Sequence, residues 1–402
     1  MSKQTFIVDG VRTPIGNFGG SLSPVRTDDL AALAIKSLLD RHPDLDLNQI
    51  EDVIMGCANQ AGEDNRNVAR MAGLLAGLPV SIGGETVNRL CASGMASVIN
   101  ASRAIKDGAG DLYIAGGVEH MTRGPWVISK ATSAYGRDSK MYDSSFGWRF
   151  VNKKMEEMYG VDGMGVTAEN LVEKYGIDRE SQDAFALWSQ QKVAQGIKNG
   201  FFDDEITPVS IPQRKKDPIQ FSQDEFPRPN SSMESLGGLR AVFKKEGSVT
   251  AGNSSGLNDG AAALLVASEN AINSNSLTPL ARIVSASVAG VEPRIMGIGP
   301  VYASQKALKQ AGLTLDDMDV IEMNEAFSAQ VLACSRAMGL DDKDSRINPN
   351  GGAIALGHPL GMTGARILLT AARQLKRNNG RYALVTMCIG VGQGYATVIE
   401  SA

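Results

Sequence analysis

The chain has 402 residues, of which 43% are hydrophobic and 21% are charged, and its formal net charge is −4. This length predicts two or three domain-sized units with enough apolar residues for a large packed core. The longest obvious apolar run, 261–267, is far shorter than the roughly 18 residues of a membrane span. The slight acidic balance argues against a nucleic-acid or membrane-surface partner. Four cysteines are too few for a disulfide framework, so we expect a cytoplasmic globular protein.

Short β-type runs alternate with helix-period segments over the first 120 residues. Strands are predicted near residues 6–8, 52–55, 85–87 and 112–115, and helices near 30–39, 67–75 and 91–106. Strands that alternate with helices predict a parallel sheet covered by helices on both faces.

The character of the chain changes near residue 120. The stretch from 121 to 249 holds all three tryptophans, the basic cluster Arg214–Lys216 and one long predicted helix over 179–198. Long irregular stretches inside a compact protein are usually functional, so we interpret this stretch as an inserted loop domain.

The first pattern returns after residue 280 with a measurable offset. The tripeptide Asp-Val-Ile occurs at 52–54 and again at 319–321, and the same offset of 267 residues separates Cys91 from His358. We therefore expect two similar α/β halves whose Cys91 and His358 approach each other across a pseudo-twofold axis. The expected division is 1–120 completed by 250–275, the insertion 121–249, and 276–402.

Cys91 is the first candidate for chemistry, because Asn88–Met95 places a thiol at a strand-to-helix turn followed by small residues. The partial positive charge at a helix N-terminus lowers the pKa of a cysteine and favours the thiolate. The alternative is a buried cysteine that only fills space, which is the interpretation we give to Cys57 and Cys334.

Three further side chains stand at strand ends or in loops where ligands gather in α/β sheets. His358 lies in the glycine-rich loop 350–359 and suits a positioned base, and Cys388 directly follows the last apolar strand. Asn324 also follows a strand and offers an amide that could orient a water or an oxyanion.

His120 suits a structural and a pocket-lining role equally. Zinc ligation is disfavoured because no close cysteine pair occurs, and no glycine cluster has dinucleotide-loop spacing.

These motifs resemble the thiolase family over essentially the whole chain. The motifs that carry the resemblance are Asn88–Gly94, Asn324–Phe327, Gly357–Pro359, Cys388–Gly390 and Thr250–Gly256 followed by Asp259-Gly260. The resemblance implies an α/β thiolase fold, in which two similar βαβαβαββ halves form a five-layer αβαβα core, with an inserted loop domain that binds coenzyme A. It also implies a homodimer or a homotetramer built as a dimer of dimers.

The resemblance also implies roles for the catalytic candidates. Cys91 is the nucleophile that becomes acylated, His358 is its base, and Cys388 exchanges a proton with C2 of the acetyl unit. Asn324, through a water, and His358 form one oxyanion site, and the backbone N–H groups of Cys91 and Gly390 form the other. No metal or cofactor is expected, because coenzyme A is a substrate.

The same resemblance points to contacts with the substrate. Short-chain biosynthetic members carry a His-Met pair at the position of Gly163-Met164, so the missing histidine argues against a strict acetoacetyl-CoA preference. The implied coenzyme A contacts are Arg228, Ser235, Leu239, Ala251 and Ser255, and the implied acyl-end contacts are Met164, Met296 and Phe327.

The stretches 56–70, 147–152 and 290–300 are similar to the 3-oxoadipyl-CoA (β-ketoadipyl-CoA) thiolase subgroup, which ends aromatic-ring catabolism. We hypothesise that Arg149 pairs with the distal carboxylate of that substrate; the alternative is that Arg149 and Arg66 make interface salt bridges. Rival functions are an acetoacetyl-CoA or general 3-ketoacyl-CoA thiolase, a 3-oxoacyl synthase of the same superfold, and a non-catalytic coenzyme A-binding protein.

Overall fold

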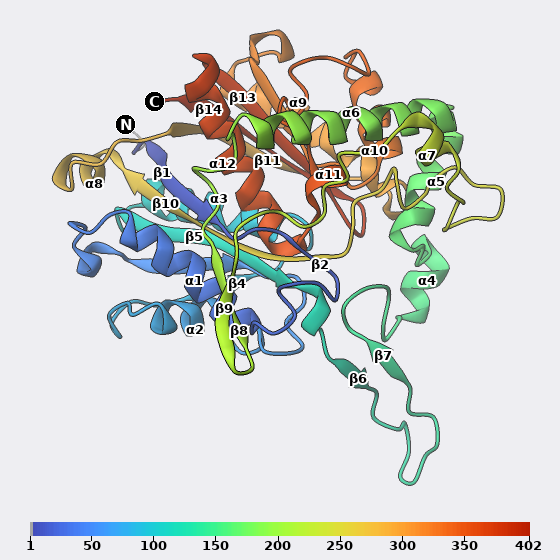
Figure 1. Ribbon diagram of the computed structural model, residues 1–402, viewed down its shortest axis with the longest axis horizontal. Helices are drawn as coiled ribbons and strands as arrows, with labels where there is room; N and C mark the ends of the chain where they lie inside the picture. The colour runs from blue at the N-terminus through green and yellow to red at the C-terminus, as the bar shows by residue number, and fades with distance from the viewer. Residues whose placement is uncertain (1–2) are drawn as a thin grey trace.

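Two pseudo-symmetric sheets dominate the computed structural model, which describes residues 3–402 (Figure 1). They join where Phe6 and Ile7 pair with Arg282 and Ala281, which gives the continuous strand order β12-β13-β14-β11-β1-β10-β5-β3-β4. The strands of the first sheet are β1 (Thr5–Arg12), β3 (Asp52–Gly56), β4 (Glu85–Val87), β5 (Leu112–His120) and β10 (Asn258–Ser268), to which the short β2 (Gly16–Asn17) adds. The second sheet contains β11 (Ala281–Gly290), β12 (Val320–Met323), β13 (Tyr382–Ile389) and β14 (Gln393–Ser401).

The helices form three layers around these two sheets. One apolar cluster packs α1 (Thr27–Asp40) and α2 (Val68–Leu75) on the outer face of the first sheet. A second cluster packs α3 (Ser93–Asp107) and α12 (Leu360–Asn378) between the two sheets. A third covers the outer face of the second sheet with α9 (Gly299–Ala311) and α10 (Ser328–Ala337). The result is the expected order of helix, sheet, helix, sheet and helix layers.

The prediction of a parallel sheet is correct for only some of the strand pairs. β3 runs parallel to β4 and β5, and β12 runs parallel to β13. In contrast, β10 lies antiparallel between β1 and β5, and β14 lies antiparallel between β11 and β13. The physical reason is that β14 follows β13 through a tight turn, and a tight turn reverses the chain direction. β10 holds the equivalent place in the first half, after the long stretch that separates it from β5.

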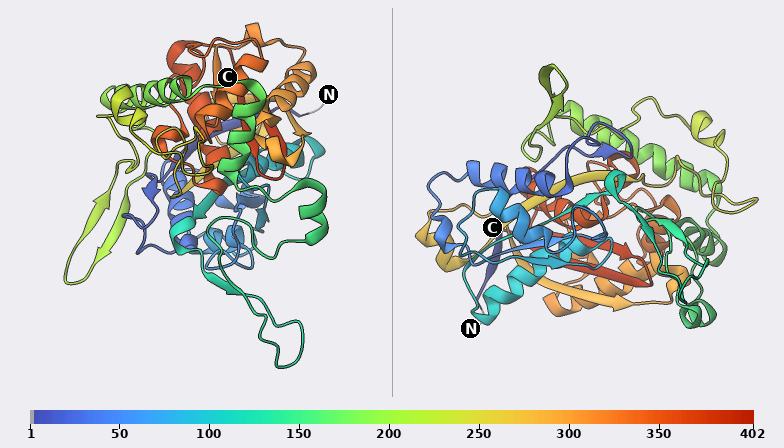
Figure 2. Two further views of the ribbon diagram at one scale, coloured as in Figure 1. Left: turned by 90° about the vertical axis from the view of Figure 1, so that its right-hand side faces the viewer. Right: turned by 90° about the horizontal axis from the view of Figure 1, so that it is seen from below.

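The stretch between β5 and β10 is less regular than the rest of the chain. The hairpin of β6 and β7 extends away from the two sheets, and the hairpin of β8 and β9 also projects (Figures 1 and 2). The elements of this stretch are η2 (Met121–Arg123), β6 (Trp126–Ile128), β7 (Met141–Asp143), α4 (Lys153–Tyr159), α5 (Met164–Tyr175), α6 (Arg179–Lys198), β8 (Val209–Gln213), β9 (Lys216–Phe221) and α7 (Met233–Gly237).

Short elements complete the fold. They are η1 (Leu47–Gln49), α8 (Glu269–Ser274), η3 (Pro293–Ile298), η4 (Leu315–Asp317) and α11 (Ala353–Leu356). Within residues 3–402, none of the helices is both long and apolar enough to cross a membrane.

Candidate active site

The central helices α3 and α12 bring the two halves together at glycines. A Cβ atom on Gly94 would lie 2.5 Å from the carbonyl oxygen of Gly361, and one on Gly364 would overlap the backbone of Met95. Only glycine allows two helix backbones to approach so closely. Because Cys91 and His358 each stand two residues before one of these helices, the close approach brings the two turns into one region, as the 267-residue offset predicts.

Cys91 follows a strained turn. Leu90 has φ +48°, a left-handed conformation that is unusual for a leucine. The Ser93 hydroxyl accepts a hydrogen bond from the Arg89 N–H at 2.8 Å and donates one to the Leu90 carbonyl at 2.7 Å, which closes the turn. A strained strand-to-helix turn of this kind presents a nucleophile at the edge of a sheet.

The prediction that the Cys91 side chain is a thiolate is wrong. Although the residue keeps some exposure, its thiol lies below the surface, and burial raises the thiol pKa to about 11. The backbone N–H of Gly390 faces the sulfur and lowers the pKa in part. Desolvation of the charged form therefore outweighs the helix terminus and the amide together.

Hydrogen bonds from the backbone N–H and from the ring fix the position of His358. Its N–H donates to Asn258 Oδ1 at 2.9 Å, and Nδ1 lies 2.7 Å from the Thr363 hydroxyl. That hydroxyl donates its own proton to the Pro359 carbonyl at 2.8 Å, so it accepts from Nδ1–H. Nε2 is then the unprotonated nitrogen of a neutral imidazole. Burial, reinforced by the charge of Arg366, lowers the pKa of His358 to about 3.

Asn324 lies beside the free nitrogen of His358. Its Nδ2 is 3.4 Å from His358 Nε2, and its backbone N–H donates to the Thr386 carbonyl at 3.0 Å. Its Oδ1 is buried and has no hydrogen-bond partner among residues 3–402. The side chain is therefore fixed in place with an acceptor still free for a water or a ligand group.

Cys388 and Gly390 come from the end of β13. Cys388 is buried, and burial together with the neighbouring Cys91 raises its pKa well above the usual range. The chain then turns through Val391, which has φ +62°, an unusual conformation for a β-branched residue. Gly390 lies between Leu90 and Met164, since a Cβ there would be 3.3 Å from Leu90 Cδ1 and 3.7 Å from Met164 Sδ. Met164 therefore lies near the Cys91 turn, and its role at the acyl end of the substrate stays a prediction.

The other two acyl-end candidates pack directly against Cys388. Met296, Phe327 and Cys388 belong to one small buried apolar cluster. Phe327 also makes an edge-to-face contact with the partly exposed Phe243, with ring centroids 6.1 Å apart. These contacts connect the buried thiols to an exposed apolar surface.

The coenzyme A candidates lie in several separate local settings. The Ser255 N–H donates to the Ala326 carbonyl at 3.0 Å, next to Phe327. Leu239 is 39% exposed and covers Gly252, which follows Ala251. Ser235 is exposed and forms a capping box with Ser232 at the start of α7, and the exposed Arg228 packs over the Phe226 ring at 5.5 Å.

One buried carboxylate near the site was not singled out by the sequence patterns. Glu119 accepts backbone N–H bonds from Ala58 and Asn59 at 3.0 Å each and from Gly361 at 2.8 Å. Burial still raises its pKa to about 7. Its place at the end of an apolar strand after two glycines is the signal that could have found it. Its neighbour His120 bonds the Leu22 carbonyl at 3.1 Å and faces Asp259, which fits the structural role.

The remaining cysteines, Cys57 and Cys334, lie in the apolar core. Cys57 and Cys334 are buried and donate to the carbonyls of Asn59 and Gly297, both at 3.1 Å, as expected for space-filling residues. All four cysteines are free thiols. From residue 3 to residue 402, no group of three or more His, Cys, Asp or Glu side chains is arranged to hold a metal ion.

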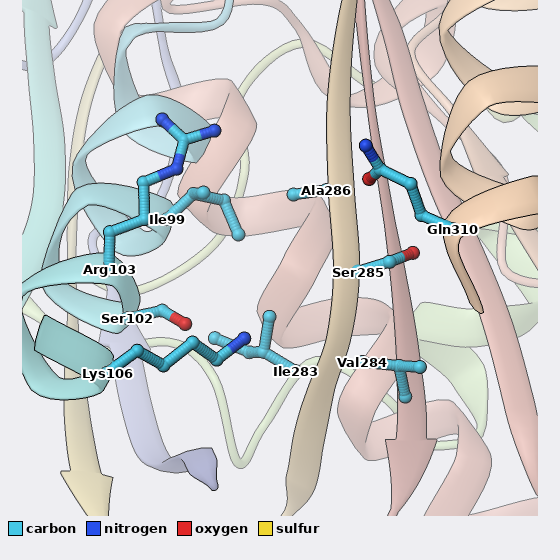
Figure 3. A pocket seen from close by; sticks show the side chains of 9 residues that line it. All are labelled: Ile99, Ser102, Arg103, Lys106, Ile283, Val284, Ser285, Ala286 and Gln310. Carbon is cyan, nitrogen blue, oxygen red and sulfur yellow. The ribbon is translucent and has the colours of Figure 1, made fainter. Parts of the chain in front are cut away.

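A cavity of about 240 Å³ lies on the other half of α3 (Figure 3). α3 supplies side chains from Ile99 to Lys106, β11 supplies Ile283–Ala286, and α9 supplies Gln310. At 1.5 Å per residue, Ile99 is already about 12 Å along the helix from Cys91. This cavity is therefore separate from the two thiols and the imidazole.

Two family profiles match almost the entire chain. The profile described as "Thiolase, N-terminal domain" matches residues 5–270, and "Thiolase, C-terminal domain" matches residues 277–401. The chain belongs to the thiolase family, and its two halves and five layers are the thiolase fold.

Individual relatives are similar over their full lengths. A beta-ketoadipyl-CoA thiolase of Acinetobacter baylyi is 56% identical over 398 residues, 99% of each chain. A 3-oxoadipyl-CoA/3-oxo-5,6-dehydrosuberyl-CoA thiolase of Escherichia coli (strain K12) is 57% identical over 398 residues, again 99% of each. The crystal structure of the Bacillus anthracis acetyl-CoA acetyltransferase has a TM-score of 0.92 at 40% identity, covering 100% of this chain and 99% of that one.

Proposed function

We propose that this protein is an acyl-CoA thiolase that cleaves 3-oxoadipyl-CoA with coenzyme A, giving acetyl-CoA and succinyl-CoA. The observation that carries the chemistry is the assembly of Cys91, Cys388, His358 and Asn324 at one junction of the two halves. The substrate assignment is supported by relatives of 56% and 57% identity over 99% of the chain that are named for this substrate.

In the cleavage direction, the Cys91 sulfur attacks C3 of the substrate while its proton passes to His358 Nε2. The tetrahedral oxyanion at C3 is stabilised by the backbone N–H groups of Cys91 and Gly390. The C2–C3 bond then breaks, and the enolate oxygen of the departing acetyl-CoA is stabilised at Asn324 and His358. Cys388 donates the proton that converts this enolate into acetyl-CoA.

The second half-reaction transfers the shortened acyl group. The thiol of coenzyme A attacks the acyl-Cys91 thioester and its proton passes to the Cys388 thiolate left by the first half-reaction, while Cys91 leaves as a thiol by taking back the proton held on His358 Nε2. A soft nucleophile, a proton donor and two oxyanion sites are the groups that this chemistry requires. The pKa values of about 11 for Cys91 and about 3 for His358 favour a neutral resting pair, so proton transfer accompanies attack.

We assign residues 121–249 to a loop domain that binds coenzyme A, between an N-terminal half (1–120 with 250–275) and a C-terminal half (276–402). The nucleotide end lies near Arg228, and the pantetheine follows Ser235, Leu239, Ala251 and Ser255 toward Phe327. The exposed apolar surface that leads from Leu239 and Phe243 to the buried thiols supports this direction.

Arg149 is our candidate for recognition of the distal carboxylate of the substrate. Its guanidinium donates to the Ser144 carbonyl at 3.1 Å and to Asn59 Oδ1 at 3.3 Å, and it forms no ion pair within residues 3–402. The Asn59 backbone N–H donates to Glu119, which also accepts from the Gly361 N–H in the first turn of α12. Adjacent Trp148 donates to the Asp162 carbonyl at 3.2 Å, two residues before Met164. A cation with neutral partners in this position is free to pair with a carboxylate.

The first test is coenzyme A-dependent thiolysis of 3-oxoadipyl-CoA and acetoacetyl-CoA in one preparation. We expect kcat/KM to favour the dicarboxyl substrate by tenfold or more, which is about 1.4 kcal/mol of transition-state discrimination. Equal or reversed values would make the protein a general short-chain thiolase. Loss of both activities would instead favour a non-catalytic coenzyme A-binding protein.

Arg149→Ala tests the recognition hypothesis. We expect a selective loss of 3-oxoadipyl-CoA turnover with acetoacetyl-CoA turnover intact, because only the first substrate carries a distal carboxylate. Arg66→Ala is the matched control from the same subgroup motifs. Equal losses on both substrates would assign Arg149 to an interface or a structural role.

We further propose a cytoplasmic homodimer or dimer of dimers without a metal or redox cofactor. β4 ends the strand order and pairs on one side only, so it can pair with the same strand of a second copy. The projecting β6–β7 hairpin exposes Trp126, Ile128 and Met141, each by 60% or more, which supports a further contact. Light scattering coupled to size exclusion would measure the assembly.

A further inference from the structure

Arg366 is a fully buried arginine without a hydrogen bond or an ion pair in the described part of the chain. None of its three guanidinium nitrogens makes a hydrogen bond within residues 3–402, and the residue is only 1% exposed. Arg12, another fully buried arginine, is paired by contrast: it contacts Asp224 at 2.7 Å and Glu205 at 3.1 Å. A buried and unpaired guanidinium is expensive, so its presence calls for a reason other than stability.

The position of Arg366 on α12 relates it to His358. Arg366 is three residues after Thr363, so the two side chains share one face of the helix. Thr363 is the residue that holds His358 Nδ1. Arg366 therefore lies one helical turn beyond Thr363, on the face of α12 that orients the imidazole.

The neighbouring strand β12 also places a buried ionisable side chain close to a residue that contacts His358. Glu322 and Asn324 are two residues apart, so their side chains leave the same face of the chain. Asn324 approaches His358 Nε2, while Glu322 is 1% exposed and its Oε1 has no partner within the described chain. The charge of Arg366 acts on both Glu322 and His358. A buried guanidinium and a buried carboxyl group, whose pKa burial raises to about 8, thus lie next to the two side chains that face the substrate.

We propose that Arg366 is a positioning residue for His358: its buried positive charge opposes a second proton on the imidazole and favours the oxyanion in front of it. This inference rests on the proposed function, in which His358 Nε2 must be unprotonated to receive the Cys91 proton. The fixed charge keeps that nitrogen available at neutral pH and stabilises the enolate without contact with the substrate.

Other charges around the imidazole do not replace Arg366. Glu325 and Glu119 are carboxyl groups of the opposite sign, held by neutral donors: Glu325 accepts from Ser189, Asn348 and the Ile354 N–H, and Glu119 accepts from three backbone N–H groups. Lys192 donates to the Ile347 carbonyl at 2.9 Å and lies over the Trp188 ring. The charged groups around the imidazole and Arg366 are Glu322, Glu325, Glu119, Lys192, Glu205 and Arg12, and the site thiols are Cys91 and Cys388.

The test is the pH titration of His358 in the full-length, unliganded protein. The chain has three histidines, so labelling with [13Cε1]histidine gives three resonances, and the one that disappears in His358→Asn is assigned. In the wild type we expect the His358 resonance to stay in its neutral position down to pH 5. In Arg366→Met we expect its midpoint to move upward by about 1–3 pH units.

Two variants control for structure. Arg366→Lys keeps the charge and should restore the wild-type titration. Arg373→Met removes another buried arginine of α12, one that pairs with Asp9 at 2.9 Å, and should leave His358 unchanged. If Arg366→Met does not fold, Arg366→Met combined with Glu322→Gln replaces both buried ionisable groups and should give the same upward shift.

An unchanged His358 midpoint in the Arg366 variants, or an equal shift in Arg373→Met, would overturn the inference. The titration needs no substrate, so its result is independent of thiolysis. A protein that shows the shift but no turnover would contradict the proposed function and leave the electrostatic role in place.

Discussion

The two halves of the molecule place different groups at equivalent points. Cys91 precedes α3 and His358 precedes α12, each by two residues and 267 residues apart. At the ends of the following strands, Glu119 pairs opposite Gly260 and Cys388 pairs opposite Gly394. The first half supplies a thiol that is partly exposed after a strained turn. The second half supplies a buried imidazole held by neutral partners, and a second buried thiol.

The difference shows how one duplicated framework divides the chemistry. A nucleophile must reach the substrate, so the Cys91 turn stays at the edge of the sheet. A base must keep one ring nitrogen free, so His358 is fixed through Nδ1 by Thr363. The framework supplies the positions, and the side chains around each position decide what it can do.

The largest expected effect is that of Cys91→Ala. We expect thiolysis to fall by about 10⁴-fold or more, because the acyl group loses its only covalent acceptor. Steady-state kinetics measures the loss, and circular dichroism with a melting curve should show the wild-type fold. Substantial residual turnover would mean that another residue of the site accepts the acyl group.

Cys388→Ser separates the two thiols. The variant should still accept an acetyl group from acetyl-CoA on Cys91, detected by mass spectrometry. Its condensation and cleavage should fall by roughly 10²- to 10⁴-fold, the usual contribution of a positioned proton donor. Normal condensation in this variant would reject the proton-transfer role.

The pH dependence of Cys91 alkylation tests the neutral resting pair. Below a thiol pKa of about 11 the thiolate fraction rises tenfold per pH unit, so the iodoacetamide rate should rise about 10³-fold from pH 7 to pH 10. Peptide mapping with Cys91→Ser as the blank identifies the modified residue. A plateau beginning near neutral pH would indicate a preformed thiolate and imidazolium.

Thr363→Val should have the smallest effect of the four. It removes the acceptor of His358 Nδ1–H while keeping the shape, and loss of about 1.5–3 kcal/mol would lower kcat roughly 10- to 100-fold. Thr363→Ser keeps the hydroxyl and should retain most of the activity. If both variants behave alike, the hydroxyl does not hold the imidazole.

Local patterns in the sequence located most of the scaffold. The helix over 179–198 has the predicted bounds, and a strand lies over 85–87 as predicted. The last apolar strand is longer than expected, so Cys388 lies within β13 rather than directly after it. The two-half arrangement followed from the offset between Cys91 and His358. The motifs also indicated the family, because they combine a reactive thiol, an imidazole and an amide in a fixed order.

Other properties depend on contacts between distant segments and only the tertiary structure decided them. The antiparallel direction of β10 depends on which strands it pairs with after the insertion, and no local sequence pattern specifies those partners. The helix terminus beside Cys91 suggested a thiolate, but burial reversed the direction of the pKa because desolvation is set by the whole surrounding fold. The burial of Glu119 and Arg366 likewise could not be predicted, because in the sequence they are ordinary charged residues. They matter at the site because the packing of the two halves removes them from water, where a single charge acts strongly on its neighbours.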